Sequence, residues 1–308
     1  MPDQQAMQLI QYTLKEDADI DTLSRLISMN PSLTAQLLGL VNSAFFSFQQ
    51  RIQTVSEAIV ITGLDQLKNL VLCFAVKDAL SQNIIQGFDM DAFWEDAVRR
   101  GVAARQLGFL LNEPTEEAFT AGMLQDIGLL VLFAMEPNKA DRWPILRSNL
   151  PDDRREMEAE LFNTTHDVVG QLVVEKWHLP GLYTRAIGGH HGFSEEGRLQ
   201  IPRNTDDYST LTGIIRFADL CNAVYTCHDK SKAMFELKCH AKNLFDLKEA
   251  TMESLLTLLP GQVEEASTLM KIDIGKQVDF RMVIEQANKK LVEDNLSYQE
   301  LTLSLIHI

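Results

Sequence analysis

Apolar residues recur at helical spacing along most of the chain, and the alternating pattern typical of strands is scarce. Asn30 followed by Pro31 is typical of a helix N-terminus, with proline in the first turn. Thr54 and Glu57 have the spacing of a capping box, and Gly63 is placed to end the helix that follows. The sequence therefore predicts an all-α protein.

The same spacing predicts the later helices. They cover residues 91–111, 116–135, 152–162, 166–177, 181–190, 208–228, 231–245, 248–258 and 261–270, with a last helix from about 277. The helix over 91–111 has small residues on its buried side, which let another helix approach closely: Ala97, Gly101, Ala104 and Gly108. The helix over 116–135 is apolar through most of its second half, so we expect it to be central. Residues 194–206 form the most linker-like stretch.

The end of the chain has a different pattern. Residues 281–300 are largely polar, with a narrow apolar stripe of Ile284, Ala287, Leu291 and Leu296. This pattern fits a connector to another domain, a dimer contact or an ordinary surface helix. Residues 301–308 are mostly apolar, so either they pack back on the body or the sequence is truncated before an output domain.

The composition of the chain argues against some classes of binding partner. The 308 residues include 28 Lys+Arg and 43 Asp+Glu, for a formal net charge of -15, and 45% are hydrophobic. This apolar fraction supports a packed core, and the acidic balance argues against nucleic-acid and anionic-membrane partners. The short basic groups Arg99–Arg100 and Arg154–Arg155 are interpreted as solvated helix faces. Without a signal peptide, a membrane-length apolar run or a disulfide framework, the sequence predicts a cytoplasmic protein.

The candidate chemistry lies in histidines and acids of the middle and later helices: Asp126, His166, His190, His191 and Asp219. Imidazole nitrogens and carboxylate oxygens are the usual ligands of a hydrolytic metal, and residues on separate helices can converge in a bundle core. Spacing alone favours the alternative that these are buried, hydrogen-bonded residues or helix-terminal groups. Adjacent histidines on one helix also point about 100° apart, which hinders their sharing one ion.

A second set of possible ligands is Cys221, Cys227–His228 and Cys239–His240. Zinc sites usually contain a closer pair of cysteines in a tight loop. Structural or incidental cysteines are therefore the better interpretation.

An ordered series of motifs over about residues 18–195 resembles the HDOD domain, a module related to the HD phosphohydrolases. The motifs are Asn30-Pro31-Ser32-Leu33, Asn42-Ser43-Ala44-Phe45-Phe46, Thr54-Val55-Ser56-Glu57, Gly63-Leu64-Asp65-Gln66-Leu67, Phe93-Trp94, Gly122-Met123-Leu124-Gln125-Asp126, Thr165-His166-Asp167, Trp177-His178-Leu179-Pro180 and His190-His191. The resemblance implies an HD-like multi-helix bundle with an N-terminal helical subdomain. We expect an HDOD domain over residues 1–205 and a C-terminal helical extension over 206–308.

The resemblance also assigns positions to the parent family's metal ligands. The His-Asp pair falls on Gln125 and Asp126, and the early histidine is replaced in the region of Asp96. The later ligands resemble His166, His190, His191 and Asp219. A glutamine amide is a poor substitute for imidazole on a transition-type ion, and an aspartate in place of a histidine changes charge and geometry. These two departures, Gln125 and Asp96, imply a degenerate metal site.

The sequence thus predicts a non-catalytic signal-transduction module that acts through protein–protein contacts and requires no cofactor. Its partner would be a separate protein or a fused output domain, for example of diguanylate cyclase type, and a homodimer through the last helix is a further expectation. The alternative is a divergent metal-dependent phosphohydrolase acting on a nucleotide or cyclic dinucleotide, with a divalent metal held by the five candidate residues. A purely structural scaffold is a third interpretation.

Overall fold

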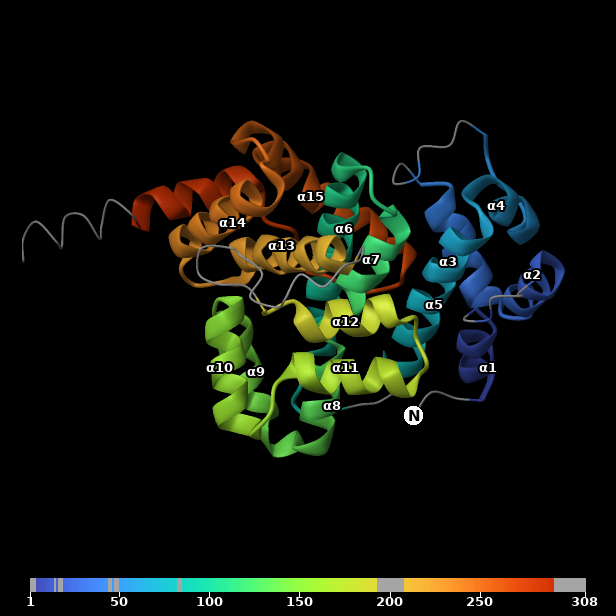
Figure 1. The fold of residues 1–308 in the computed structure, drawn as a ribbon, viewed down its shortest axis with the longest axis horizontal. Helices are drawn as coiled ribbons and strands as arrows, with labels where there is room; N and C mark the ends of the chain where they lie inside the picture. The colour runs from blue at the N-terminus through green and yellow to red at the C-terminus, as the bar shows by residue number, and fades with distance from the viewer. Residues whose placement is uncertain are drawn as a thin grey trace, which may run out of the picture.

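A computed structural model describes residues 4–13, 15, 19–43, 46, 50–81, 85–192 and 208–290. Regular secondary structure over these residues is entirely helical, which confirms the all-α prediction. One end of the molecule is formed by the N-terminal helices (Figure 1). These are α1 (Gln4–Thr13), α2 (Ile20–Ser28), α3 (Pro31–Val41) and α4 (Val55–Thr62), and α5 (Leu64–Ser81) joins them to the rest.

The predicted helix boundaries in this subdomain are confirmed by their capping bonds. The Asn30 side chain accepts a hydrogen bond from the Leu33 backbone N–H at 3.1 Å, with Pro31 in the first turn of α3. Thr54 and Glu57 make both bonds of the capping box before α4. Gly63, which follows α4, has a φ angle of 91°, a conformation that favours glycine.

Two closely packed helices form the centre of the fold: α6 (Met90–Leu111) and α7 (Thr115–Leu124). A Cβ atom on Gly101 would lie 2.7 Å from Met123 Cγ, and one on Gly122 would lie 2.8 Å from the Arg100 carbonyl oxygen. The small residues therefore allow the close helix approach that the sequence predicted. This packing also fixes the backbone of Arg100 in the middle of the bundle.

The prediction of a single helix over residues 116–135 is wrong, because the structure contains two helices there, α7 and α8 (Ile127–Met135). The interruption falls at Gln125 and Asp126. After it, α8 approaches the next part of the fold so closely that a Cβ atom on Gly128 would lie 2.1 Å from the His166 carbonyl oxygen. The change of direction at Asp126 makes this approach feasible, whereas periodicity alone favours a continuous helix.

Residues Thr115–Met135 together have the length and apolar composition needed to cross a membrane, but 83% of the apolar window is buried inside the protein. Interior packing accounts for this hydrophobicity.

The chain then continues through shorter helices, which pack on α7, α8 and one another. They are η1 (Pro137–Arg142), α9 (Trp143–Arg147), α10 (Pro151–Phe162), α11 (His166–Lys176) and α12 (Gly181–Gly189). The predicted linker at 194–206 lies outside the described residues.

The C-terminal part adds α13 (Tyr208–Thr226), α14 (Lys230–Phe245) and α15 (Glu249–Leu269). The sequence predicted two helices over 248–258 and 261–270, which is wrong, since α15 continues through Pro260. A proline has no N–H for the carbonyl four residues earlier. That carbonyl, on Leu256, instead accepts a hydrogen bond from the Tyr225 hydroxyl at 2.6 Å. A contact between helices thus compensates for the proline.

The last described helix covers residues 280–290. Phe280, Val283 and Ala287 are buried, and the Ala287 carbonyl accepts a hydrogen bond from the Ser231 hydroxyl at 2.7 Å. Over these residues the helix lies on the body of the protein. The predicted stripe residues Leu291 and Leu296 and the apolar tail at 301–308 lie outside the described residues.

Candidate functional site

The five candidate ligands come together in the interior, although they belong to different elements. Asp126 lies between α7 and α8, His166 begins α11, and Asp219 lies on α13. His190 and His191 directly follow α12. Their ligand atoms form two groups in which all members lie within 4.8 Å of one another: His166, His190 and His191, and Asp126, His190 and Asp219. We call His166, His190 and His191 the histidine half of the site, and Asp126 and Asp219 the carboxylate half.

In the histidine half, every imidazole has an oxygen acceptor at Nδ1. These acceptors are Glu158 Oε2 at 2.6 Å from His166, the Ile187 carbonyl at 2.7 Å from His190, and Asp152 Oδ1 at 2.8 Å from His191. Nδ1 of His166 and of His190 donates to its oxygen acceptor, whereas Nδ1 of His191 also lies 3.2 Å from a terminal nitrogen of Arg216. Nε2 of His166 lies 3.2 Å from Nε2 of His190 and 3.2 Å from Nε2 of His191. Hydrogen bonds at Nδ1 thus orient three Nε2 atoms toward one another, an arrangement typical of metal ligands.

The carboxylate half is paired with buried arginines. Asp126 Oδ2 lies 3.0 Å from a terminal nitrogen of Arg100 on α6 and 3.0 Å from one of Arg154 on α10. Arg154 also contacts Asp219 Oδ2 at 3.2 Å. The interpretation of these basic residues as solvated helix faces is therefore wrong: Arg99, Arg100 and Arg154 are 4%, 0% and 3% exposed. Each has carboxylate partners, which allows a charge to be buried.

These arginines keep Asp126 ionised. Burial alone would raise the pKa of this carboxyl group, but the positive charges of Arg100 and Arg154 outweigh burial and hold it well below its usual range. The pKa of Arg154 rises for the reciprocal reason, because Asp126 and Asp219 outweigh the effect of burial.

His166 is the member of the histidine half whose pKa is raised. Burial by itself would lower its pKa, but the carboxylates of Glu158 and Asp126 outweigh burial and raise it above its ordinary value. Burial lowers the pKa of His190 and His191, and the neighbouring histidines lower both further. The innermost carboxyl groups, on Asp126, Glu158 and Asp219, therefore lie next to the guanidinium groups of Arg100 and Arg154 and the imidazole of His166.

The network reaches the surface beside His191. The Asp152 side chain is 54% exposed and pairs with Arg216 at 2.6 Å as well as with His191. Asp126, His166 and His190 are completely buried. The exposed part of the network is therefore a rim of ion pairs, and its centre lies inside the protein.

The two positions that depart from the parent pattern have different environments. Asp96 is 1% exposed, and its oxygens contact Arg147 at 2.7 and 2.8 Å and Arg99 at 3.0 Å. Burial would raise the pKa of Asp96, but the bond from Arg147 and the nearby positive charges lower it. Asp96 belongs to neither group of convergent ligand atoms. Gln125 is completely buried, and neither amide atom has a hydrogen-bond partner among the described residues.

Three residues that pair with the five candidates were not predicted from the sequence to belong to the site: Arg100, Arg154 and Glu158. A local signal existed only for Arg154 and Glu158, which stand four residues apart and contact each other at 3.6 Å on α10. The possible zinc ligands Cys221, Cys227–His228 and Cys239–His240 are not supported as a site. Neither group of converging ligand atoms among the described residues contains a cysteine. His240 instead contacts the Gly213 carbonyl at 3.2 Å.

The fold and the buried histidines and acids define an HD-type, all-α protein class. The sequence pattern of the HDOD domain matches residues 1–193, and the chain belongs to the HDOD domain family.

Known relatives agree with this fold. The structure of a candidate phosphohydrolase from Shewanella amazonensis SB2B is 24% identical, with a TM-score of 0.66, and the match covers 88% of this chain and 94% of that chain. A candidate signal transduction protein from Marinobacter aquaeolei VT8 is 18% identical, with a TM-score of 0.60, over 88% of this chain and 59% of that one. An uncharacterized protein of Treponema pallidum (strain Nichols) is 23% identical over 66% of this chain, which spans only 38% of that relative.

Proposed function

We propose that this chain is a non-catalytic HDOD signal-transduction module with a degenerate metal site. The observation that carries the proposal is the position of Arg154, whose guanidinium group lies between Asp126 and Asp219. These are the two carboxylates that the family resemblance assigns to metal binding. In this chain an internal cation already neutralises them.

Charge supports this interpretation. Two like unit charges about 4 Å apart repel by roughly 4 kcal/mol at an effective dielectric constant near 20. A divalent ion beside Asp126 would face the guanidinium groups of both Arg100 and Arg154 at such short range. The residues present therefore do not fit a dinuclear hydrolytic centre, which needs free carboxylates and an open coordination position for water.

The substitutions in the ligand set support the same conclusion. Gln125 offers a neutral amide where the parent family has a histidine, and Asp96 is held by Arg147 and Arg99. Two of the expected ligand positions are thus unsuited to a transition-type ion. The polar cluster is better explained as a paired network that fixes the relative positions of α6, α10, α11 and α13.

We infer that the module works in the cytoplasm by transmitting a signal through helix contacts to a protein partner or a fused output domain, such as one of diguanylate cyclase type. An HDOD unit over 1–205 and an extension over 206–308 remain the proposed division. A hydrogen-bonded route between them supports transmission: Arg99 donates to Gln277 Oε1 at 2.9 Å, and Gln277 donates to Glu95 at 3.1 Å. Gln277 lies three residues before the last described helix, which is where we place a homodimer contact.

The test is metal content combined with hydrolysis. The native protein and the Gln125→His variant would each be incubated with Mn²⁺, Fe²⁺ or Zn²⁺, desalted and analysed for bound metal. Both would then be assayed with nucleotides and cyclic dinucleotides. We expect no stoichiometric metal and no hydrolysis with the native protein. Stoichiometric metal together with hydrolysis by the native protein would contradict the proposal.

The second candidate is a divergent metal-dependent phosphohydrolase. One observation favours it: the histidine half keeps three Nε2 atoms oriented toward one another, each ring with an acceptor at Nδ1. This function requires that His190→Asn abolish both metal uptake and hydrolysis, because His190 belongs to both ligand groups. If the native protein and His190→Asn behave alike, the second candidate is excluded.

A further inference from the structure

A cavity of about 470 Å³ lies in the N-terminal subdomain, away from the buried ionic site. Its wall is formed by α1, α2, α3 and α5 together with the turn after α15. The volume is within the range of sites for small molecules, which is about 300 to 1,000 Å³. Residues far apart in the sequence, from Gln8 to Lys271, thus line the same cavity.

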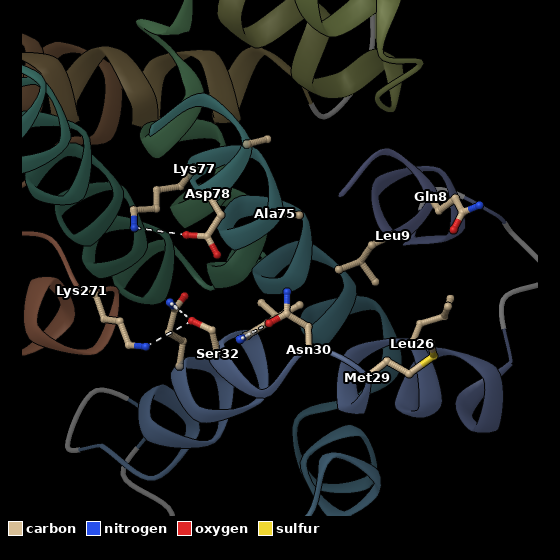
Figure 2. Close-up of a pocket in the computed structure, with 13 residues that line it drawn as sticks. Gln8, Leu9, Leu26, Met29, Asn30, Ser32, Ala75, Lys77, Asp78 and Lys271 are labelled. Carbon is tan, nitrogen blue, oxygen red and sulfur yellow. Dashed lines mark hydrogen bonds and ion pairs between the residues drawn. The ribbon is translucent and has the colours of Figure 1, made fainter. Parts of the chain in front are cut away.

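One side of this cavity is polar and carries a net positive charge (Figure 2). Lys77 is 8% exposed, and its ammonium group donates to Asp78 at 3.2 Å and to the Met270 carbonyl at 3.1 Å. Lys271 donates to the Ser32 hydroxyl at 3.2 Å. Two lysines and one aspartate leave one positive charge in a chain whose net charge is -15. The cavity is therefore suited to a monoanion.

A buried acceptor adds to this chemistry. Gln36 lines the cavity and is 3% exposed. Its amide nitrogen donates to Ser32 at 3.3 Å, but its Oε1 atom has no hydrogen-bond partner among the described residues. A buried acceptor without a partner destabilises the folded state by roughly 1 to 3 kcal/mol. Oε1 itself is buried, so a turn of the Gln36 side chain toward the cavity would let a ligand N–H or O–H group beside its anionic head satisfy this atom.

The opposite side of the cavity is mainly apolar, with Gln8 beside Leu9. Leu9, Leu26 and Met29 lie across from Lys77 and Lys271 in Figure 2. Their side chains belong to α1, α2 and the residue that ends α2. An apolar chain of a ligand would contact this wall while its anionic head lies at the lysines.

We propose that this cavity binds a small amphipathic carboxylate that has a hydrogen-bond donor next to its head. The carboxylate lies at Lys77 and Lys271, the donor meets Gln36 Oε1, and the apolar chain packs on Leu9 and Leu26. No residue of this site belongs to the histidine or carboxylate half. A failure of this proposal therefore leaves the proposed function of the module intact, and the reverse also holds.

The probe for the experiment is N-octanoylglycine, which has a carboxylate, an amide N–H and an apolar chain. Isothermal titration calorimetry of the whole chain would compare the native protein with Lys271→Gln and Gln36→Leu, and with Lys248→Gln as a control at an exposed lysine outside the cavity. We expect binding to weaken about tenfold in each cavity variant, as loss of one charged or buried hydrogen bond implies, and to stay unchanged in the control. Circular dichroism would verify that every variant is folded.

Two further probes test the head group and the donor. Octanoate lacks the amide N–H, so it should bind the native protein about tenfold more weakly than N-octanoylglycine does, and this difference should vanish in Gln36→Leu. Octyl phosphate should bind more weakly than N-octanoylglycine, because its head carries more negative charge than the cavity balances. Absence of N-octanoylglycine binding, equal binding by Lys271→Gln, or tighter binding of octyl phosphate would overturn the proposal.

Discussion

The two halves of the buried site differ in what satisfies their polar groups. Asp126 and Asp219 are paired with guanidinium groups from other helices, so their charge is compensated inside the protein. His166, His190 and His191 are held through Nδ1, and their Nε2 atoms face one another. The carboxylate half thus has cationic partners from other helices, whereas the histidine half has Nε2 atoms directed at one another.

This difference shows that a residue of the type that binds metal can be present and still be paired with another side chain. Asp126 matches the parent pattern in sequence, yet Arg100 and Arg154 occupy its surroundings. The Nε2 atoms of His166, His190 and His191, by contrast, face one another with no arginine between them that the contacts above record. A polar site can therefore keep most of its residues while the charge balance around them supports a structural role.

The strongest test of the carboxylate half is Arg154→Met. This change leaves Asp126 and Asp219 buried without one shared cation, and loss of one member of a buried ion pair typically costs about 3 to 5 kcal/mol. We expect a decrease of that size in the free energy of unfolding, measured by urea denaturation. The control is Lys232→Met, where a 52% exposed side chain pairs with a 51% exposed Asp153. The control should lose less than about 1 kcal/mol. Equal stability of the two variants would show that the network does not stabilise the fold.

The connection between the two halves is tested by Gly128→Ala. Gly128 follows Asp126 closely and contacts the backbone of His166, so the new Cβ atom would lie 2.1 Å from the His166 carbonyl oxygen. Because backbone atoms cannot move aside as a flexible side chain can, we expect the free energy of unfolding to fall by about 1 to 3 kcal/mol in thermal or urea unfolding. Gly261→Ala is the control, since nothing lies within 4 Å of its Cβ position on α15. If both variants are equally stable, the close approach of α8 and α11 is not as the structure describes.

The features best predicted from the sequence are those that depend on residues close together along the chain. The caps at Asn30 and Thr54 use residues three positions away, and both are present in the structure. Helical spacing likewise located α6, whose glycines indicated close packing. These features follow from local physics, so one sequence is enough to recognise them.

Long-range contacts explain the predictions that were wrong. Arg154 looked like part of a solvated face, because its partner Asp219 is 65 residues away. The helix break at Asp126 depends on α11, and the continuity of α15 through Pro260 depends on the hydroxyl of Tyr225. Periodicity carries no information on these partners. The family resemblance named five residues that the fold brings together, but only the fold revealed the cations beside them.

The histidine half can be tested through the pH dependence of stability. The pKa of His166 is raised in the folded state, so its contribution to stability is complete below its unfolded pKa of about 6.5 and is lost as pH rises through the folded pKa. The pKa of His191 is lowered, so its contribution is present above about 6.5 and is lost as pH falls. The two residues should therefore give opposite slopes.

Urea denaturation at a series of pH values would compare His166→Gln with His191→Gln. A one-proton difference between states changes stability by about 1.4 kcal/mol per pH unit. Relative to the native protein, we expect His166→Gln to flatten the decline above about pH 6.5 and His191→Gln to flatten the decline below it. Each variant serves as the control for the other, and the same change of slope in both would show that their environments do not differ.

The smallest effect is expected at Gln125, where the parent family has its defining histidine. Both amide atoms of Gln125 are buried without a hydrogen-bond partner among the residues described here. Replacement by an apolar side chain of similar size then removes no hydrogen bond, so Gln125→Leu should change the free energy of unfolding by less than about 1 kcal/mol, or increase it. The control is Asn222→Leu, which removes the acceptor that Arg99 contacts at 2.7 Å and should cost about 1.5 to 3 kcal/mol. A loss at Gln125 as large as at Asn222 would mean that its amide is bound in the folded protein. The contrast between a carboxylate half paired with arginines and a histidine half with converging Nε2 atoms would then have to include the amide of Gln125.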